Sequence, residues 1–175
     1  MLGMATLVLG PTPPELSEYL ERRQSLGQDR YDEVWEGVYH VAPAPNVWHG
    51  YAALRVAEIL ASASRAAGLT PTDPFNLGGP DDYRVPDLGY HREFPTATFV
   101  PTAAIVVEVV SPDDQTDAKL PFYAAHGVDE VLVVEPARRA VSWFVRTGGN
   151  YEPQPASRLL GISAAEIAAG LRWPG

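Results

Sequence analysis

The sequence contains no cysteine among its 175 residues. This excludes a disulfide framework, a thiolate metal site and a cysteine nucleophile. The sequence also lacks an apolar run long enough to cross a bilayer, and its apolar start, MLGMATLVLGP, has no basic residue ahead of it, so a signal peptide is a poor interpretation. We therefore expect a cytoplasmic protein without a membrane-spanning segment.

Positive charge is also scarce, because the formal net charge is −9 at pH 7. This balance argues against a broadly cationic nucleic-acid binder. Of the 13 basic residues, 12 are arginine and one, Lys119, is lysine. Arginine cannot replace lysine where a compact ammonium, or an amine able to lose its proton, must fit beside a substrate. The lone lysine therefore supports a functional role for Lys119.

Hydrophobic residues make up 46% of the chain and charged residues 20%, which is typical of a globular protein. A chain of this length can bury a proper core as one unit, so we expect a single domain over residues 1–175.

Local signals predict an alternation of helices and strands. Thr12-Pro13-Pro14-Glu15 has the form of a capping box before a helix that stops near Gly27, and Asn46 is placed to cap a long helix that ends at Gly68. Asp113 or Asp114 can cap a third helix that ends at Gly127, and Ser163 to Glu166 forms a capping box before a short last helix.

Strands are predicted between these helices: a hairpin over 31–41 that turns at Glu36-Gly37, then 69–77, 88–90, 103–110, 130–135 and 140–145. This order predicts a mixed α/β fold in which one sheet of roughly five or more strands packs against the longest helix. Along that helix, alternating three- and four-residue steps predict a sheet-facing side made of His49, Ala52, Val56, Ile59 and Ala63.

The segment from Asp87 to Lys119 organises the functional interpretation. Every residue from Ala103 to Val110 is apolar except Glu108, which is typical of a strand buried on both faces. An ionised carboxylate there costs several kcal/mol unless a cation or hydrogen-bond donors compensate it. Asp87 precedes another short strand, and two acids on adjacent strands favour either a shared proton or a bound divalent cation.

Each of these residues also has a structural interpretation. Asp87 could cap a turn, Glu108 could pair with a buried arginine, and Lys119 could be a solvated helix residue. Taken together and in this order, the three favour a site. Glu33 is either an exposed hairpin residue or a further member of the site, and His49 is either a hydrogen-bonded core histidine or a catalytic residue.

The ordered motifs resemble the Uma group of restriction-endonuclease-like proteins, within the PD-(D/E)XK nuclease superfamily. The resemblance covers about residues 31–151, and the pieces that carry it are the Glu36-Gly37 hairpin, the helix that opens with His49, Val85-Pro86-Asp87, Val107 to Pro112, Asp117-Ala118-Lys119, Tyr123 and Gly127 to Glu130.

This resemblance implies a restriction-endonuclease-like fold, a mixed β-sheet flanked by helices, and a site that binds Mg²⁺ or Mn²⁺. By matched position, Asp87 and Glu108 would hold the metal and Lys119 would assist the attacking water, with His49 as a further catalytic candidate. One departure is that the superfamily places lysine two residues after the second acid, where this chain has Val110. Either the lysine has moved to Lys119 or the site is incomplete; a rival assignment takes Asp117 as the acid that precedes it.

Two functions follow from the sequence. The first is a Mg²⁺-dependent nuclease acting on phosphodiester bonds, with DNA as the expected partner. The second is a catalytically inactive protein that keeps the nuclease fold as a dimeric binding module, which the acidic balance favours. A homodimer is compatible with both, and two arginine pairs, Arg22-Arg23 and Arg138-Arg139, are candidates for a basic surface.

Overall fold

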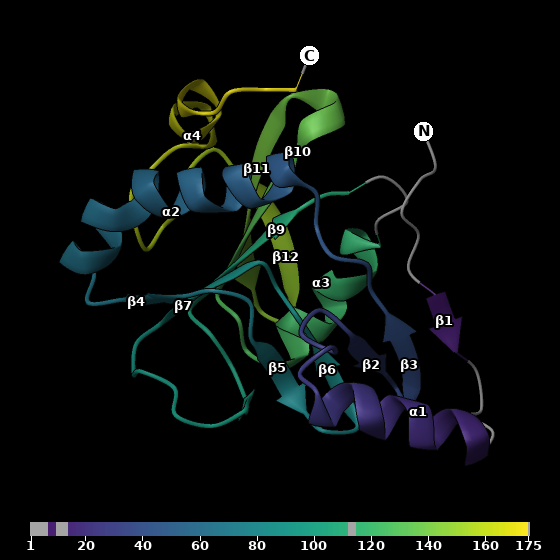
Figure 1. Cartoon of the computed structure of the whole chain (residues 1–175). Helices are drawn as coiled ribbons and strands as arrows, with labels where there is room; N and C mark the ends of the chain where they lie inside the picture. The colour runs from purple at the N-terminus through teal and green to yellow at the C-terminus, as the bar shows by residue number, and fades with distance from the viewer. Residues whose placement is uncertain (1–6, 10–13, 112–114, 175) are drawn as a thin grey trace.

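A computed structural model describes residues 7–9, 14–111 and 115–174 of the chain (Figure 1). Its helices are α1 (Pro14–Ser25), α2 (Val47–Ala66), α3 (Thr116–Ala125) and α4 (Ala164–Gly170), with a short 3-10 turn, η1 (Pro136–Arg138). The strands are β1 (Leu7–Leu9), β2 (Glu33–Trp35), β3 (Val38–Val41), β4 (Thr70–Thr72), β5 (Asn76–Gly79), β6 (Asp82–Arg84), β7 (Leu88–His91), β8 (Phe99–Val100), β9 (Ile105–Val109), β10 (Glu130–Glu135), β11 (Ala140–Thr147) and β12 (Asn150–Gln154).

The strands form two mixed sheets, whereas the sequence predicted one. The large sheet has six strands in the order β12-β11-β10-β9-β7-β4, and the small sheet has six in the order β1-β3-β2-β6-β5-β8. Only β9 with β10 and β5 with β8 pair in parallel among these described strands. Helix α3 makes the crossover between β9 and β10, as parallel neighbours require. The expected mixed α/β fold with flanking helices is confirmed.

The predicted strand over 69–77 is the reason for this difference. Its first part is β4, which pairs with β7 in the large sheet, and its last part opens β5, which pairs with β6 in the small sheet. Asp73-Pro74 separates the two, and proline cannot donate a ladder hydrogen bond, so the chain turns there and changes sheets.

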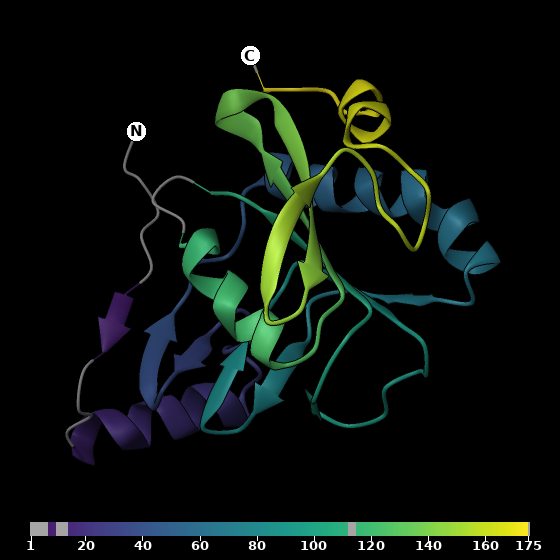
Figure 2. The same cartoon turned by 180° about the vertical axis from the view of Figure 1, so that it is seen from behind.

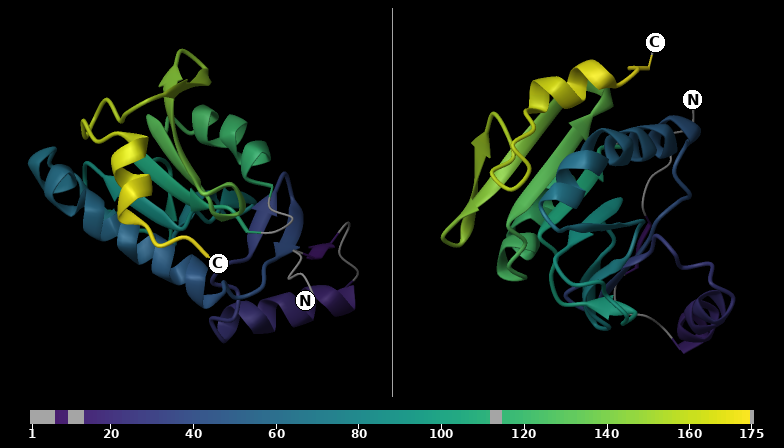
Figure 3. Two further views of the ribbon diagram at one scale, coloured as in Figure 1. Left: turned by 90° about the horizontal axis from the view of Figure 1, so that it is seen from above. Right: turned by 90° about the vertical axis from the view of Figure 1, so that its left-hand side faces the viewer.

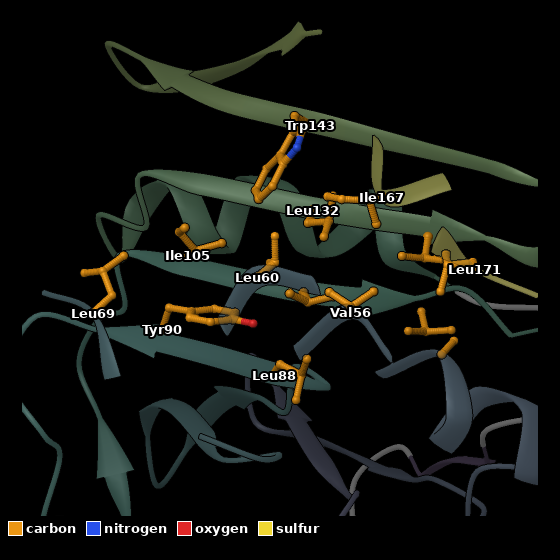
Figure 4. Close-up of a cluster of buried hydrophobic side chains, with 14 of the residues drawn as sticks. Val56, Leu60, Leu69, Leu88, Tyr90, Ile105, Leu132, Trp143, Ile167 and Leu171 are labelled. Atoms are coloured by element: carbon orange, nitrogen blue, oxygen red, sulfur yellow. The ribbon is translucent and has the colours of Figure 1, made fainter. Parts of the chain in front are cut away.

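Helices α2 and α4 cover one face of the large sheet and bury the main hydrophobic core (Figures 3 and 4). The buried side of α2 consists of Ala52, Val56, Leu60 and Ser64, so the predicted face is rotated at its C-terminal end. Ile59 instead lies against Gly170 of α4, because α2 packs on that helix as well as on the sheet.

Helix α3 and strand β5 cover the opposite face of the large sheet, where Leu77, Val106, Tyr123 and Val131 form a second cluster (Figure 2). Side chains alternate along β9, so Ile105, Val107 and Val109 join the main core while Val106 joins the second cluster. Glu108 follows the same alternation and points toward α3.

Several local predictions are confirmed. Glu36 and Gly37 have φ of 50° and 82°, the two positive values of a tight hairpin turn. The Asn46 side chain caps α2 by accepting from the amide of His49, and Ser163 with Glu166 forms a capping box before α4. The expected caps at Thr12, Asp113 and Asp114 lie outside the described residues. No helix in the described part of the chain is both long and apolar enough to span a membrane.

The packing predicts that Gly89→Ala will destabilise the fold. A Cβ at Gly89 would lie 2.3 Å from Phe75 and 2.7 Å from His91, so both rings must move. Overpacking of this kind costs about 1–3 kcal/mol. Gly50→Ala in α2 is the control, because a Cβ there meets nothing within 4 Å and alanine favours a helix over glycine. Urea unfolding of both variants measures the difference; equal stability would show that both rings yield without cost.

Candidate active site

Pairing of β7 with β9 brings Asp87 beside Glu108. Leu88 pairs with Val107 in an antiparallel register, so the preceding residue, Asp87, falls opposite Glu108. The Asp87 amide donates to the Val107 carbonyl at 3.0 Å, and the Val109 amide donates to Asp87 Oδ2 at 2.7 Å. The two acids predicted from the sequence therefore lie side by side, where β7 begins and β9 ends.

Glu108 is 3% exposed and is held from α3. The Tyr123 hydroxyl donates to Glu108 Oε1, and Lys119 Nζ lies 3.3 Å from Oε1 and 3.4 Å from Oε2. Lys119 and Tyr123 are four residues apart, so both project from the same side of the helix. Asp117, the acid of the rival assignment, is exposed.

Lys119 makes its shortest described ion pair with Glu33 of the small sheet, at 2.9 Å from Nζ to Oε1. Glu33 is 7% exposed, so its interpretation as an exposed hairpin residue is wrong. Its Oε1 also accepts from the Val85 amide at 2.7 Å, and its Oε2 accepts from the indole N–H of Trp35 at 2.7 Å. The lysine thus joins an acid from each sheet.

His49, in the first turn of α2, contacts Asp87. Its Nε2 lies 2.7 Å from Asp87 Oδ1, and its Nδ1 lies 3.2 Å from Ser111 Oγ. A carboxylate can only accept, so Nε2–H donates to Asp87, and a neutral ring accepts the Ser111 hydroxyl through Nδ1. His49 is therefore a hydrogen-bonded member of the site rather than of the apolar core.

The cluster has more acids than bases, with Glu33, Asp87 and Glu108 around Lys119 and His49. Burial raises the pKa of Glu108 from 4.5 to about 8; the positive charge of Lys119 opposes this shift, and the charges of Asp87 and Glu33 add to it. Burial, followed by the charge of Glu108, raises the pKa of Tyr123 well above 10. Burial and the two neighbouring acids thus favour the protonated form of Glu108, whereas Lys119, or a further cation beside it, favours the ionised form.

The donor set fits a hard divalent cation. Asp87 and Glu108 supply adjacent carboxylates with excess negative charge, and Mg²⁺ commonly takes one or two carboxylates while it keeps several waters. Within residues 7–9, 14–111 and 115–174, no three histidine, aspartate or glutamate side chains are grouped as a metal-binding set. The metal site at Asp87 and Glu108 therefore stays a prediction.

The site is only partly open to solvent. The side chain of Asp87 is 16% exposed and that of Glu108 is 4% exposed, so Asp87 is the more open of the two acids; the Lys119 side chain is 12% exposed. Two surface cavities, of about 600 Å³ and 420 Å³, are lined by other residues, one around Arg23 and Arg30 and one by residues 91–104.

The two arginine pairs do not form one basic surface. Helix α1, which carries Arg22 and Arg23, and the η1 turn lie at opposite ends of the molecule (Figures 1 and 2). Arg23 pairs with the buried Asp32 at 2.8 Å, and Arg138 pairs with Glu135 at 2.9 Å.

Sequence reasoning assigned no role to Ser111, Tyr123 or Trp35. Tyr123 follows Lys119 by one helical turn, and that spacing is a signal that could have identified it. Trp35 comes two residues after Glu33 and so lies on the same face of β2, which is also visible in the sequence. Ser111 has no such signal, because its partner His49 is 62 residues away.

Two comparisons with known proteins match this chain to nuclease-like proteins. A family model described as Uma2, putative restriction endonuclease, matches residues 16–173. A crystal structure of a putative nuclease belonging to DUF820 from Anabaena variabilis ATCC 29413 superimposes with a TM-score of 0.63 and 15% identity, over 79% of this chain and 90% of that one. That likeness shows a shared fold. No curated protein matches the chain.

The raised pKa of Glu108 predicts how stability depends on pH. The unfolded state ionises Glu108 near its ordinary pKa of 4.5, whereas the folded state holds the proton up to about pH 8. The contribution of Glu108 to stability is therefore complete below pH 4.5 and is lost as pH rises through 8. Glu108→Gln cannot titrate, so the free energy of unfolding of the variant minus that of the parent should grow over this window. Chemical denaturation in chelator at several pH values measures it, and a constant difference would contradict the shift.

Proposed function

This chain belongs to the Uma2 family, and on that premise we propose that it is a Mg²⁺-dependent nuclease that hydrolyses phosphodiester bonds, with DNA as its substrate. The observation that carries this proposal is the position of the only lysine in the chain. Its amine lies 3.3 Å from the buried Glu108, whose neighbour across the β7–β9 pair is Asp87. Two acids and an ammonium, gathered where β7 begins and β9 ends, are the groups that metal-assisted phosphodiester hydrolysis needs.

In this proposal Asp87 and Glu108 hold the divalent cation, which when bound neutralises charge on the phosphate and lowers the pKa of a water molecule. Lys119 orients the attacking water and stabilises the charge that develops on the phosphate oxygens. His49 fixes the carboxylate of Asp87 through its Nε2–H, and the Val109 amide fixes the other oxygen. Tyr123 fixes Glu108 through its hydroxyl.

A specific observation favours the second candidate, a binding module that keeps the nuclease fold without cleavage. The Glu108 side chain is only 4% exposed and is already paired with Lys119. The two arginine pairs lie apart, and the net charge is −9, so these pairs do not supply the local basic surface that duplex DNA requires. Such a module would bind a partner by a surface other than this closed cluster.

Cleavage separates the two candidates. We expect purified protein with Mg²⁺ or Mn²⁺ to nick or cut DNA and chelator to stop it, as gel assays on plasmid DNA would show. Lys119→Ala should lower turnover by roughly 10²-fold, on the scale of one lost acid–base or electrostatic group. Lys119→Arg should also be impaired, because a guanidinium fork is bulkier than an ammonium and does not lose its proton.

Full activity in Lys119→Arg would mean that positive charge alone suffices at this position. Full activity in Lys119→Ala would remove the residue from the mechanism. A parent protein that binds metal but cuts neither DNA nor RNA would favour the binding module.

Metal binding is expected to stabilise the fold independently of any substrate. At about a hundredfold excess over the dissociation constant, Mg²⁺ or Mn²⁺ should add roughly 2.7 kcal/mol to the free energy of unfolding. Asp87→Asn should abolish this increment. Asp117→Asn is the matched control, since Asp117 is an exposed acid two residues from Lys119. Denaturant titrations with and without metal test this, and a parent protein indifferent to both metals has no site.

A further inference from the structure

One face of the small sheet carries a row of buried charged or titratable side chains. His40 pairs with Glu33 across β3 and β2, and the pairing of Val34 with Tyr83 places Arg84 on the other side of Glu33. All three are less than 10% exposed. Burying a charged or polar side chain costs free energy unless it is hydrogen-bonded or paired, so each member of this row is expected to have such partners.

Three groups outside this row hold the Glu33 carboxylate in a single orientation. Both of its carboxylate oxygens are used, Oε1 by the Val85 amide and Lys119 and Oε2 by the indole N–H of Trp35. The carboxylate cannot rotate without breaking one of these bonds. Glu33 is thus fixed by the backbone of its own sheet and by its neighbour two residues along β2.

Trp35 is itself held by rings and charge. Its ring stacks on the His40 ring, with the two centroids 4.7 Å apart. The Arg84 guanidinium lies 4.3 Å from the centroid of the Trp35 ring. Arg84 also lies 4.1 Å from the ring of Phe122 on α3 and donates to the Val34 carbonyl at 2.8 Å. The indole N–H is therefore aimed at Glu33 by a packed stack that reaches the same helix as Lys119.

The Lys119 amine lies closer to Glu33 than to Glu108. A lysine side chain has four rotatable carbon bonds and loses much rotamer freedom when it is fixed. Its amine lies 2.9 Å from Glu33 but 3.3 Å from the nearer oxygen of Glu108. Glu33 comes from the small sheet and Glu108 from the large one, so the pair fixes the amine from two directions.

We propose that Glu33 is the positioning residue of Lys119, and that the Trp35 indole N–H sets the orientation in which Glu33 holds the amine. Neither residue touches the substrate or the metal. The effect on cleavage rests on the proposed nuclease function, whereas the effect on the lysine side chain does not. A misplacement of the amine by about 1 Å is enough to lower turnover by roughly 10²-fold.

The lone lysine makes the positioning directly measurable. Protein labelled with ¹³C- and ¹⁵N-lysine gives one side-chain signal, that of Lys119. We expect the parent protein to show a rigid side chain with two inequivalent Hε protons. Trp35→Phe keeps an aromatic ring against His40 and Arg84 but removes the N–H, and Glu33→Gln removes the ion pair. Both should make the Hε protons equivalent and lower kcat by about 10-fold or more, with KM unchanged.

Trp48→Phe is the matched control. It also removes an indole N–H bond, the one of 2.9 Å to the Arg172 carbonyl, whose two partners lie on α2 and after α4 rather than on β2 or α3. It should leave the lysine signal and kcat as in the parent. Melting curves establish that each variant is folded, and if Glu33→Gln does not fold, Trp35→Phe decides.

Three results separate the possibilities. An unchanged lysine signal in folded Trp35→Phe and Glu33→Gln overturns the positioning role. Loss of the metal-induced stabilisation in Glu33→Gln also overturns it, because Glu33 would then be a metal ligand. If the parent protein cuts no nucleic acid while both variants free the lysine side chain, the positioning role stands and the nuclease proposal alone fails.

Discussion

The Lys119 ammonium, shared between Glu33 of the small sheet and Glu108 of the large sheet, is the interaction on which the described site depends. Each sheet contributes one buried carboxylate to the place where the two sheets meet α3. The Lys119 ammonium on α3 offsets part of the cost of burying both carboxylates. Removing one partner of a buried ion pair leaves an uncompensated charge, which is far more costly than the pair itself is stabilising. The angle between α3 and the two sheets is therefore constrained by charge as well as by the packing of Tyr123 and Phe122.

One ammonium does not balance three acids, and this imbalance links the structure to its chemistry. The pKa of Glu108 rises to about 8 because burial dominates over the attraction of Lys119. A group in that condition takes up a cation or a proton, whichever is supplied. His49 and the Val109 amide hold Asp87 in place beside it, so contacts within the chain fix the Asp87 carboxylate through both of its oxygens.

The same strand that carries Glu108 also forms the centre of the hydrophobic core. Ile105, Val107 and Val109 pack against α2 and α4, while Glu108 faces α3 from the opposite side of β9. The position of the carboxylate is thus fixed by the most buried part of the molecule. Gly89, on the neighbouring strand, leaves room for Phe75 and His91, so the packing of these two rings against β7 depends on a residue without a side chain.

The sequence alone determined the local elements and the most conspicuous acid. Periodicity and capping residues predicted the hairpin at Glu36-Gly37, the long helix after Asn46 and the last helix after Ser163, because these signals act between residues within one turn or one hairpin. Glu108 was identifiable because a single acid in an apolar strand needs a partner wherever that strand lies.

Only the tertiary structure decided that the strands form two sheets, that Glu33 is buried against Lys119, that His49 binds Asp87 and Ser111, and that the two arginine pairs lie apart. These facts depend on which distant strands pair and on which face a short strand presents. A strand of three or four residues has the same alternation whichever sheet it joins. Its partners are therefore set by the packing of the whole chain and not by its own sequence.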